Sequence, residues 1–136
     1  MKLKCRYPAR DWTNAKAQVR EVLIERAQAK GIISYIELTG NITAIQLEPD
    51  SVALWTLLHE INTEENAAGR GMLSAVVVHA SGDMQPGQGF FDLADKLGKN
   101  TDDILECWIK ELKRVYDYWS MAKGKSPAGL SGSKQT

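Results

Sequence analysis

The side chains best suited to acid–base chemistry or metal binding are His59, Glu60 and Glu64, with His79 further along the chain. Glu60 and Glu64 are one helical turn apart and share a face, whereas His59 points about 100° away from Glu60. The His-x-x-x-His spacing of helical zinc sites is therefore absent. A solvated helix face is the favoured interpretation, and we predict no metal ion and no cofactor. An enzyme of unrecognised type using His59, Glu64 and His79 is kept as an alternative, which requires these groups and Arg70 to share one cleft.

Ser74 and a glycine-rich bend suggest two further chemistries. Ser74 lies in an apolar run with no base beside it in the sequence, so a core serine is favoured over a nucleophile. Gly82, Gly87 and Gly89 surround Pro86, but their spacing matches neither the P-loop nor the dinucleotide fingerprint. A sharp turn explains these residues better than a phosphate cradle. No catalytic residue is predicted.

Charge is distributed unevenly, although the net charge is zero. Residues 1–30 carry eight Lys or Arg and three Asp or Glu, whereas residues 31–69 carry six acidic residues and no Lys or Arg. Phosphate binding requires cations along the path of the backbone. The candidate nucleic-acid contacts are therefore Arg6, Arg10, Arg20, Lys30 and Arg70, and solvated helix-face charge is the alternative.

Aromatic and acidic surface predicts contact with another protein. In the last predicted helix, Tyr116, Tyr118 and Trp119 point in directions that cannot all face one core. The third predicted helix presents Glu60 and Glu64, whose carboxylates would repel a phosphodiester backbone. These five residues are the candidate contacts for a protein partner or a second copy of the chain.

The apolar run Met72–Ala80 is the densest in the chain, and it predicts a buried strand around which the helices pack. Cap residues and glycines mark the other elements. They are a helix from Asp11 to about Lys30, an extended piece at Ile32–Ile33, a short helix from the capping box Ser34–Glu37 to Gly40, a helix opening at Pro49–Ser51 and fading over Asn62–Asn66, a helix at Phe90–Leu97, and a long helix capped by Thr101–Asp103 and ending near Ala122. Residues 42–47 fit either a short strand or a loop.

Composition and length predict one globular domain over residues 1–122, followed by a disordered Gly/Ser/Lys-rich tail over 123–136. The chain has 136 residues, 43% of them hydrophobic and 25% charged, as in ordinary soluble domains. No apolar run approaches the roughly 18 residues of a membrane span, and the first residues lack the apolar core of a signal peptide. These features predict a cytoplasmic protein without membrane contact. Cys5 and Cys107 are accordingly predicted to be reduced thiols.

The order of these elements resembles a winged-helix module. Gly-Ile-Ile-Ser-Tyr-Ile-Glu-Leu at 31–38 and the run Leu73–Val78 are similar to the C-terminal DNA-binding module of the O6-alkylguanine alkyltransferase and alkyltransferase-like families, over roughly residues 19–90. Ser74 stands where that family has its acceptor cysteine, and Ala75 and Val76 stand where His-Arg follow. A serine without a positioned base does not support alkyl transfer. Residues 31–69 also lack any arginine to match the family's base-flipping arginine.

A second resemblance covers most of the chain. Arg-x-Met-Leu-Ser-Ala-Val-Val-Val at 70–78, Pro-Gly-x-Gly-Phe-Phe at 86–91 and a tryptophan-containing last helix resemble a widespread set of small uncharacterised bacterial proteins. That resemblance implies no known activity.

The sequence thus predicts an α+β, mostly helical fold. Its expected core is winged-helix-like, with three helices, a strand and a glycine-rich wing, and a long C-terminal helix is added to it. The predicted function is a non-catalytic interaction module that binds a protein partner in a nucleic-acid-linked pathway. Direct binding of double-stranded nucleic acid through the basic N-terminal third and the wing is the alternative, with the enzyme hypothesis third.

Overall fold

The chain folds into helices that enclose two very short strands. The computed structural model describes residues 7–49, 51–79 and 85–125, with side chains as far as Ser120. In chain order the elements are α1 (Ala9–Gln28), β1 (Ile33–Ser34), α2 (Tyr35–Gly40), α3 (Val52–Ala67), the 3-10 turn η2 (Leu73–Val76), β2 (Val77–Val78), α4 (Gln88–Lys96) and α5 (Ile104–Lys125).

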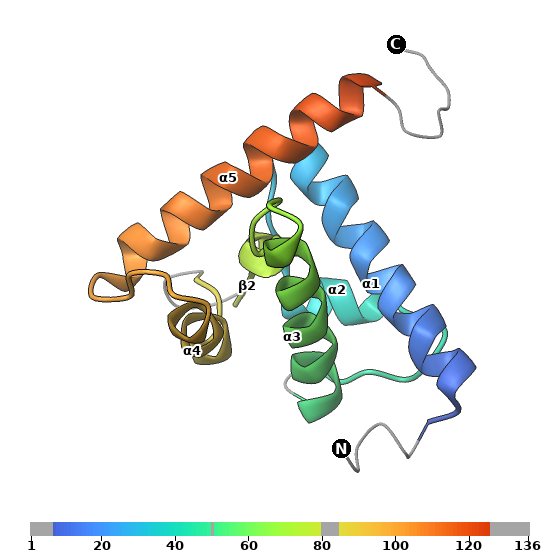
Figure 1. The fold of residues 1–136 in the computed structure, drawn as a ribbon. Coiled ribbons are helices and arrows are strands. Elements are labelled where there is room, and N and C mark those ends of the chain that lie inside the picture. The colour runs from blue at the N-terminus through green and yellow to red at the C-terminus, as the bar shows by residue number, and fades with distance from the viewer. Residues whose placement is uncertain (1–6, 50, 80–84, 126–136) are drawn as a thin grey trace.

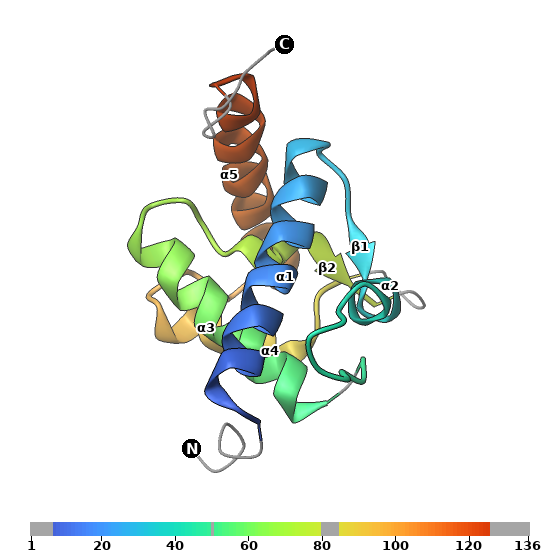
Figure 2. The ribbon, with the colours of Figure 1, turned by 90° about the vertical axis from the view of Figure 1, so that its right-hand side faces the viewer.

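Helix α5 lies along one edge of the molecule, with α1, α3 and α4 all on one side of it (Figure 1). Helices α1 and α3 run side by side and contact each other. Figure 2 shows β1 descending from the end of α1 to α2, with β2 beside it. The mostly helical character predicted from the sequence is confirmed, and the winged-helix likeness stays a prediction. None of the helices in the described ranges combines the length and the apolarity that a bilayer crossing requires.

The centre of the fold is the segment Met72–Val78, which we call the central segment. Each of its residues is at most 4% exposed, and η2 within it contacts α1, α3 and α5. Helices therefore surround the apolar run on several sides, which accounts for its lack of polar residues apart from Ser74.

Side chains from the surrounding helices hydrogen-bond the backbone of the central segment. The Met72 amide donates to Glu111 Oε1 at 3.2 Å, and the Ser74 amide donates to Asn62 Oδ1 at 2.9 Å. Trp108 Nε1 donates to the Ala75 carbonyl at 2.8 Å. A buried backbone outside regular structure needs such partners, because an unpaired amide or carbonyl is costly away from water.

The predicted strand over Met72–Ala80 is mostly wrong. Leu73–Val76 forms a 3-10 turn, and only Val77–Val78 is extended; it pairs in parallel with β1 through Ile33↔Val77 and Ser34↔Val78. An apolar run buried on all sides carries no period, so it does not distinguish a strand from a helical turn. The neighbours of η2 are helices, which offer no backbone ladder for a longer strand to join. The last predicted residue, Ala80, lies outside the described residues.

Helix boundaries follow local capping chemistry, with two corrections. Ser34, Ser51 and Asp103 accept hydrogen bonds from amides three residues on, as the sequence predicts. Helix α1 instead starts at Ala9 behind Pro8, whose φ of −55° suits a helix entry, so Asp11 lies in the first turn and is not the cap. The last helix continues through Lys125, past the predicted start of the tail at Lys123, and residues 126–136 lie outside the described residues.

The undecided stretch at residues 42–47 has no strand. Gln18 on α1 explains how this irregular backbone is held. Its side-chain oxygen accepts the amides of Thr43 and Ala44, both at 3.0 Å. Its nitrogen donates to the Thr43 hydroxyl at 2.8 Å. The loop therefore gains partners from a helix in place of a strand.

Asn62→Ala tests how much the central segment depends on its side-chain partners. The substitution leaves the Ser74 amide without its acceptor in a buried place, so we expect a loss of about 2 kcal/mol in the free energy of unfolding. Thr63→Ala is the matched control, since Thr63 is exposed on the next position of α3 and should change stability by less than about 0.5 kcal/mol. Urea denaturation measures both. Equal effects of the two variants would contradict the role given to Asn62.

Candidate functional site

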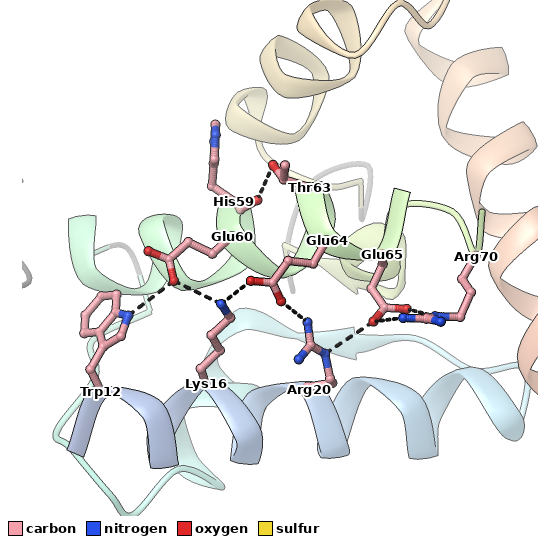
Figure 3. Close-up of polar contacts among 9 residues, drawn as sticks. All are labelled: Trp12, Lys16, Arg20, His59, Glu60, Thr63, Glu64, Glu65 and Arg70. Atoms are coloured by element: carbon pink, nitrogen blue, oxygen red, sulfur yellow. Dashed lines mark hydrogen bonds and ion pairs between the residues drawn. The ribbon is translucent and has the colours of Figure 1, made fainter. Parts of the chain in front are cut away.

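Helices α1 and α3 are joined by a row of ion pairs that we call the ladder (Figure 3). Lys16 Nζ lies 3.3 Å from Glu60 and 2.5 Å from Glu64. Arg20 continues the row, at 2.5 Å from Glu64 and 3.3 Å from Glu65. Trp12 Nε1 also donates to Glu60 at 3.3 Å. Successive turns of one helix thus meet successive turns of the other through opposite charges.

Glu65 ends the ladder as a buried carboxylate, only 2% exposed. Arg70 binds it with two nitrogens, Nε at 2.6 Å and Nη2 at 3.1 Å. A buried carboxylate requires this kind of charge-assisted pairing, because its desolvation is otherwise too costly. The Arg70 guanidinium also lies 5.9 Å from the ring centroids of both Tyr118 and Trp119 on α5. Arg70 therefore ties the end of α3 to the last helix.

The ladder determines where several predicted site residues lie. Arg20 and Arg70, predicted to contact phosphate, bind carboxylates of α3. Glu60 and Glu64, predicted to contact a partner, bind the bases of α1. Two bases of the N-terminal third, Lys16 and Arg20, are thus compensated by acidic residues of the neighbouring helix. The other predicted phosphate contacts are Arg10 and Lys30, exposed at the start and just beyond the end of α1, and Arg6, which lies outside the described residues.

The predicted aromatic contacts on α5 have three different environments. Tyr116 is half-buried and donates its hydroxyl to the Gly31 carbonyl at 2.7 Å. Tyr118 is exposed, and its ring contacts that of Trp119 edge-on with centroids 4.9 Å apart. Trp119 is half-buried, and its Nε1 has no hydrogen-bond partner among the described residues. Of the three, Tyr118 offers the most surface.

The opposite face of α3 lines a cavity of about 180 Å³. His59 points away from the ladder in Figure 3, and it is one of the cavity residues. The wall draws on segments distant in the sequence: Tyr35 from α2, Trp55, His59 and Asn62 from α3, Ser74 from η2, His79 after β2, and Gly87, Gly89 and Phe90 at the start of α4. Trp55 and His79 are exposed, so they lie where the cavity meets solvent.

Aromatic contacts order the two histidines. The His59 ring lies against Trp55 with centroids 4.9 Å apart, and the His79 ring lies against Tyr35 at the same separation. Glycine at position 89 makes room for the indole, because a Cβ there would lie 2.1 Å from Trp55 Nε1. The two imidazoles therefore belong to one aromatic enclosure.

Several polar atoms in this wall have hydrogen-bonding capacity left over. The Tyr35 hydroxyl accepts the Gly87 amide at 2.9 Å, and burial raises the pKa of this hydroxyl, so it stays protonated and keeps its own hydrogen to donate. Ser74 Oγ accepts from Asn62 Nδ2 at 2.7 Å, which leaves the serine hydrogen free as well. Nδ1 of His59 is buried without a hydrogen-bond partner among the described residues. Such an atom is costly to bury unless a ligand or water meets it.

The enzyme hypothesis required four groups in one cleft, and the cavity contains two of them. His59 and His79 line it, whereas Glu64 and Arg70 belong to the ladder and are not among its lining residues. Ser74 lines the cavity and is hydrogen-bonded to Asn62, with no base among its recorded partners. Among the described lining residues there is no Asp, Glu, Lys, Arg or Cys.

Sequence reasoning missed Tyr35, Trp55, Asn62 and Gly89 as site residues. In the sequence, Tyr35 belongs to a capping box and to the motif at 31–38, and neither pattern marks its side chain as part of a site. The one available signal was the pair of glycines at 87 and 89, which the sequence analysis assigned to a turn. Cys107 is a free, buried thiol whose pKa is raised by burial and then by Glu111, so it is a poor nucleophile. Cys5 lies outside the described residues.

The ladder should give stability a measurable pH dependence through Glu64. Hydrogen bonds from Lys16 and Arg20 lower the pKa of the Glu64 carboxyl below its usual value of 4.5. A carboxyl with a lowered folded-state pKa stabilises the protein above its unfolded pKa, and this contribution is lost as pH falls through the folded pKa. Glu64→Gln should therefore lower the free energy of unfolding at pH 7 by less than about 1 kcal/mol, because Glu64 is half exposed. The effect should be smaller at pH 3, below the usual carboxyl pKa of 4.5.

Urea denaturation at pH 7 and pH 3 measures this difference. Glu21→Gln, an exposed change on α1 outside the ladder, is the control and should show a smaller difference between the two pH values. A Glu64→Gln effect of the same size at both pH values would contradict the electrostatic role of the ladder.

Comparison of the chain with protein-family models, curated proteins and solved structures finds no match in any of the three.

Proposed function

We propose that the protein is a non-catalytic binding module that holds a small, neutral, planar ligand in the cavity between α3, η2 and α4. The observation that carries this proposal is the buried Nδ1 of His59, which has no hydrogen-bond partner among the described residues and belongs to a residue in the wall of a largely apolar cavity. A ligand that fills the cavity and reaches this atom removes both an empty volume and an unsatisfied polar group.

The size of the cavity sets the size of the ligand. A cavity of about 150 Å³ in another protein accepts benzene, so the volume of about 180 Å³ found here suits one aromatic ring with a small substituent. The rings of Trp55, His59, Tyr35 and His79 favour a planar molecule, because aromatic rings gain from offset or edge-on contact.

Hydrogen-bonding capacity sets the ligand's polar groups. The free hydrogens of Tyr35 and Ser74 are donors, so the ligand should carry an acceptor such as a carbonyl or a ring nitrogen. A formal charge on the ligand is disfavoured, because no described lining residue is an acid or a strong base that could compensate it in this apolar place. A one-ring aromatic amide or a neutral heterocycle combines these properties.

Binding without turnover is favoured over catalysis. A general base needs orientation and a suitable pKa, which a hydrogen-bonded carboxylate commonly supplies to histidine. Here the His59 ring contacts the ring of Trp55, and the His79 ring contacts the ring of Tyr35. Glu64 is about one and a half turns along α3 from His59, and its partners are Lys16 and Arg20.

Binding of a protein partner and direct binding of nucleic acid, both predicted from the sequence, remain proposals. A protein partner gains support from exposed apolar residues on α5, which are treated in the next subsection. Direct nucleic-acid binding, which the winged-helix likeness also implies, needs bases that are available to phosphate. Arg20 and Arg70 are instead paired with carboxylates, so fewer of the described bases are available than the sequence predicts.

Titration with benzamide, followed by ¹H–¹⁵N NMR, tests the cavity directly. We expect saturable shifts of the Trp55 indole signal and of amides around His59 and Ser74. Benzoate should bind about tenfold or more weakly, because its charge would have to be buried without a counter-ion. Cyclohexanecarboxamide, which keeps the amide but lacks the flat ring, should also bind more weakly than benzamide.

Gly89→Ala provides the matching variant, because its Cβ would displace the Trp55 indole and change the cavity. We expect it to weaken benzamide binding by about tenfold or more. Gly40→Ala is the control, since nothing lies within 4 Å of a Cβ at that position. Thermal melts confirm that both variants are folded. Absence of saturable binding by benzamide, or equal binding by Gly89→Ala and wild type, would overturn the proposal.

A further inference from the structure

Helix α5 carries a second apolar face beside the one that packs on the core. Cys107, Glu111 and Val115 face the interior and are at most 4% exposed. Leu105 and Ile109 are 47% and 52% exposed. Leu112 and Tyr116 continue their line as half-buried residues that also pack against the core. We call Leu105, Ile109, Leu112 and Tyr116 the outer stripe. None of these four residues lines the cavity, so this face is separate from the proposed ligand site.

The spacing of the outer stripe is that of a helix–helix seam. Its residues are separated by four, three and four positions, which is the a/d pattern of helices that pack along their length. At about 100° per residue, the stripe is turned well over 90° from the line of Cys107, Glu111 and Val115. Another helix can therefore lie against the exposed Leu105 and Ile109 and against the parts of Leu112 and Tyr116 that the core leaves uncovered.

The charges beside the stripe select the direction of that second helix. Glu106 and Lys113 lie seven residues apart along one edge of it. Suppose that two copies of α5 pair antiparallel, with the twofold axis between Ile109 and Leu112. Glu106 of one copy then lies at nearly the same height along the helix axis as Lys113 of the other, with an offset of about 3 Å. In a parallel pair in register, Glu106 would lie at the level of the other copy's Glu106, and Lys113 at the level of the other copy's Lys113. Antiparallel pairing alone puts opposite charges together on this edge.

The geometry points to a second copy of this chain as the occupant of the outer stripe. The face is self-complementary under a twofold axis in both its apolar spacing and its charges, as an isologous dimer requires. The chain beyond Lys125 is a poorer occupant, because residues 126–136 contain one large apolar side chain, Leu130. Leu105 and Ile109 are 47% and 52% exposed, so the other described elements leave this part of the stripe uncovered. The protein is thus a homodimer through α5.

Sedimentation equilibrium of the full chain, from micromolar to millimolar concentration, tests this assembly. We expect a reversible monomer–dimer equilibrium. Ile109→Lys should weaken it by about tenfold or more, because a lysine in the centre of the stripe would have to be buried at the seam. Ile36→Lys is the matched control, since Ile36 is 66% exposed on α2, outside the stripe, and the same substitution there should leave dimerisation unchanged.

Charge reversal tests the antiparallel direction. Glu106→Lys and Lys113→Glu should each weaken the dimer several-fold, and the double variant should return to within about twofold of wild type. This recovery cannot come from within one helix. Glu106 pairs with Lys110, and Lys113 pairs with Asp117, so in the double variant both intrahelical contacts become like-charged.

Each outcome decides the inference. A protein that stays monomeric to millimolar concentration overturns it, as does a dimer that Ile109→Lys leaves intact or that Ile36→Lys weakens equally. A double charge reversal that does not recover overturns the antiparallel direction. A monomeric chain that binds a different protein only when Ile109 is present overturns the second copy as the occupant. None of these results depends on ligand binding in the cavity.

Discussion

The fold depends on placing a nearly fully buried piece of backbone, made of one 3-10 turn and a two-residue strand, at its centre. The central segment has neither a full helix nor a wide sheet to pair its amides and carbonyls, because β2 meets only the two residues of β1. Asn62, Trp108 and Glu111 supply part of what is missing, from α3 and α5. These helices consequently cannot shift without unpairing buried backbone, which fixes their positions more strictly than apolar packing alone would.

Two buried carboxylates extend this constraint to the connection before η2. Glu65 binds Arg70, and Glu111 binds the Met72 amide and lies 3.3 Å from Lys99. Between them Gly71 has φ of +88°, and a Cβ there would lie 2.9 Å from Arg114 Cδ. The chain must therefore turn sharply between two buried charges, which only glycine does without strain. Burying each carboxylate is unfavourable by itself, so both act chiefly by specifying where the chain passes.

Local signals in the sequence predict the helices well and the centre and the site poorly. Ser34, Ser51 and Asp103 act through amides three residues away, so their effect is visible in the sequence. The 3-10 turn depends instead on partners contributed by distant helices. The cavity is formed by Tyr35 meeting His79 and by Trp55 meeting Gly89, contacts across more than thirty residues that periodicity does not encode. Several of the charged residues that the sequence marks as site candidates, such as Glu64 and Arg70, instead form ion pairs within the fold.

The residues that helix α3 contributes to the ladder and to the cavity lie on different faces of this helix. One face bears Glu60, Glu64 and Glu65, each of which is paired with a base of α1 or with Arg70. The other face bears His59, whose Nδ1 lacks a partner among the described residues. A buried unpaired nitrogen costs about 1–3 kcal/mol, and the helix tolerates it because the ladder and Asn62 hold α3 in place independently of that face. Under the proposed function, this unsatisfied atom on α3 is a preorganised contact for the ligand, since little order remains to be created on binding.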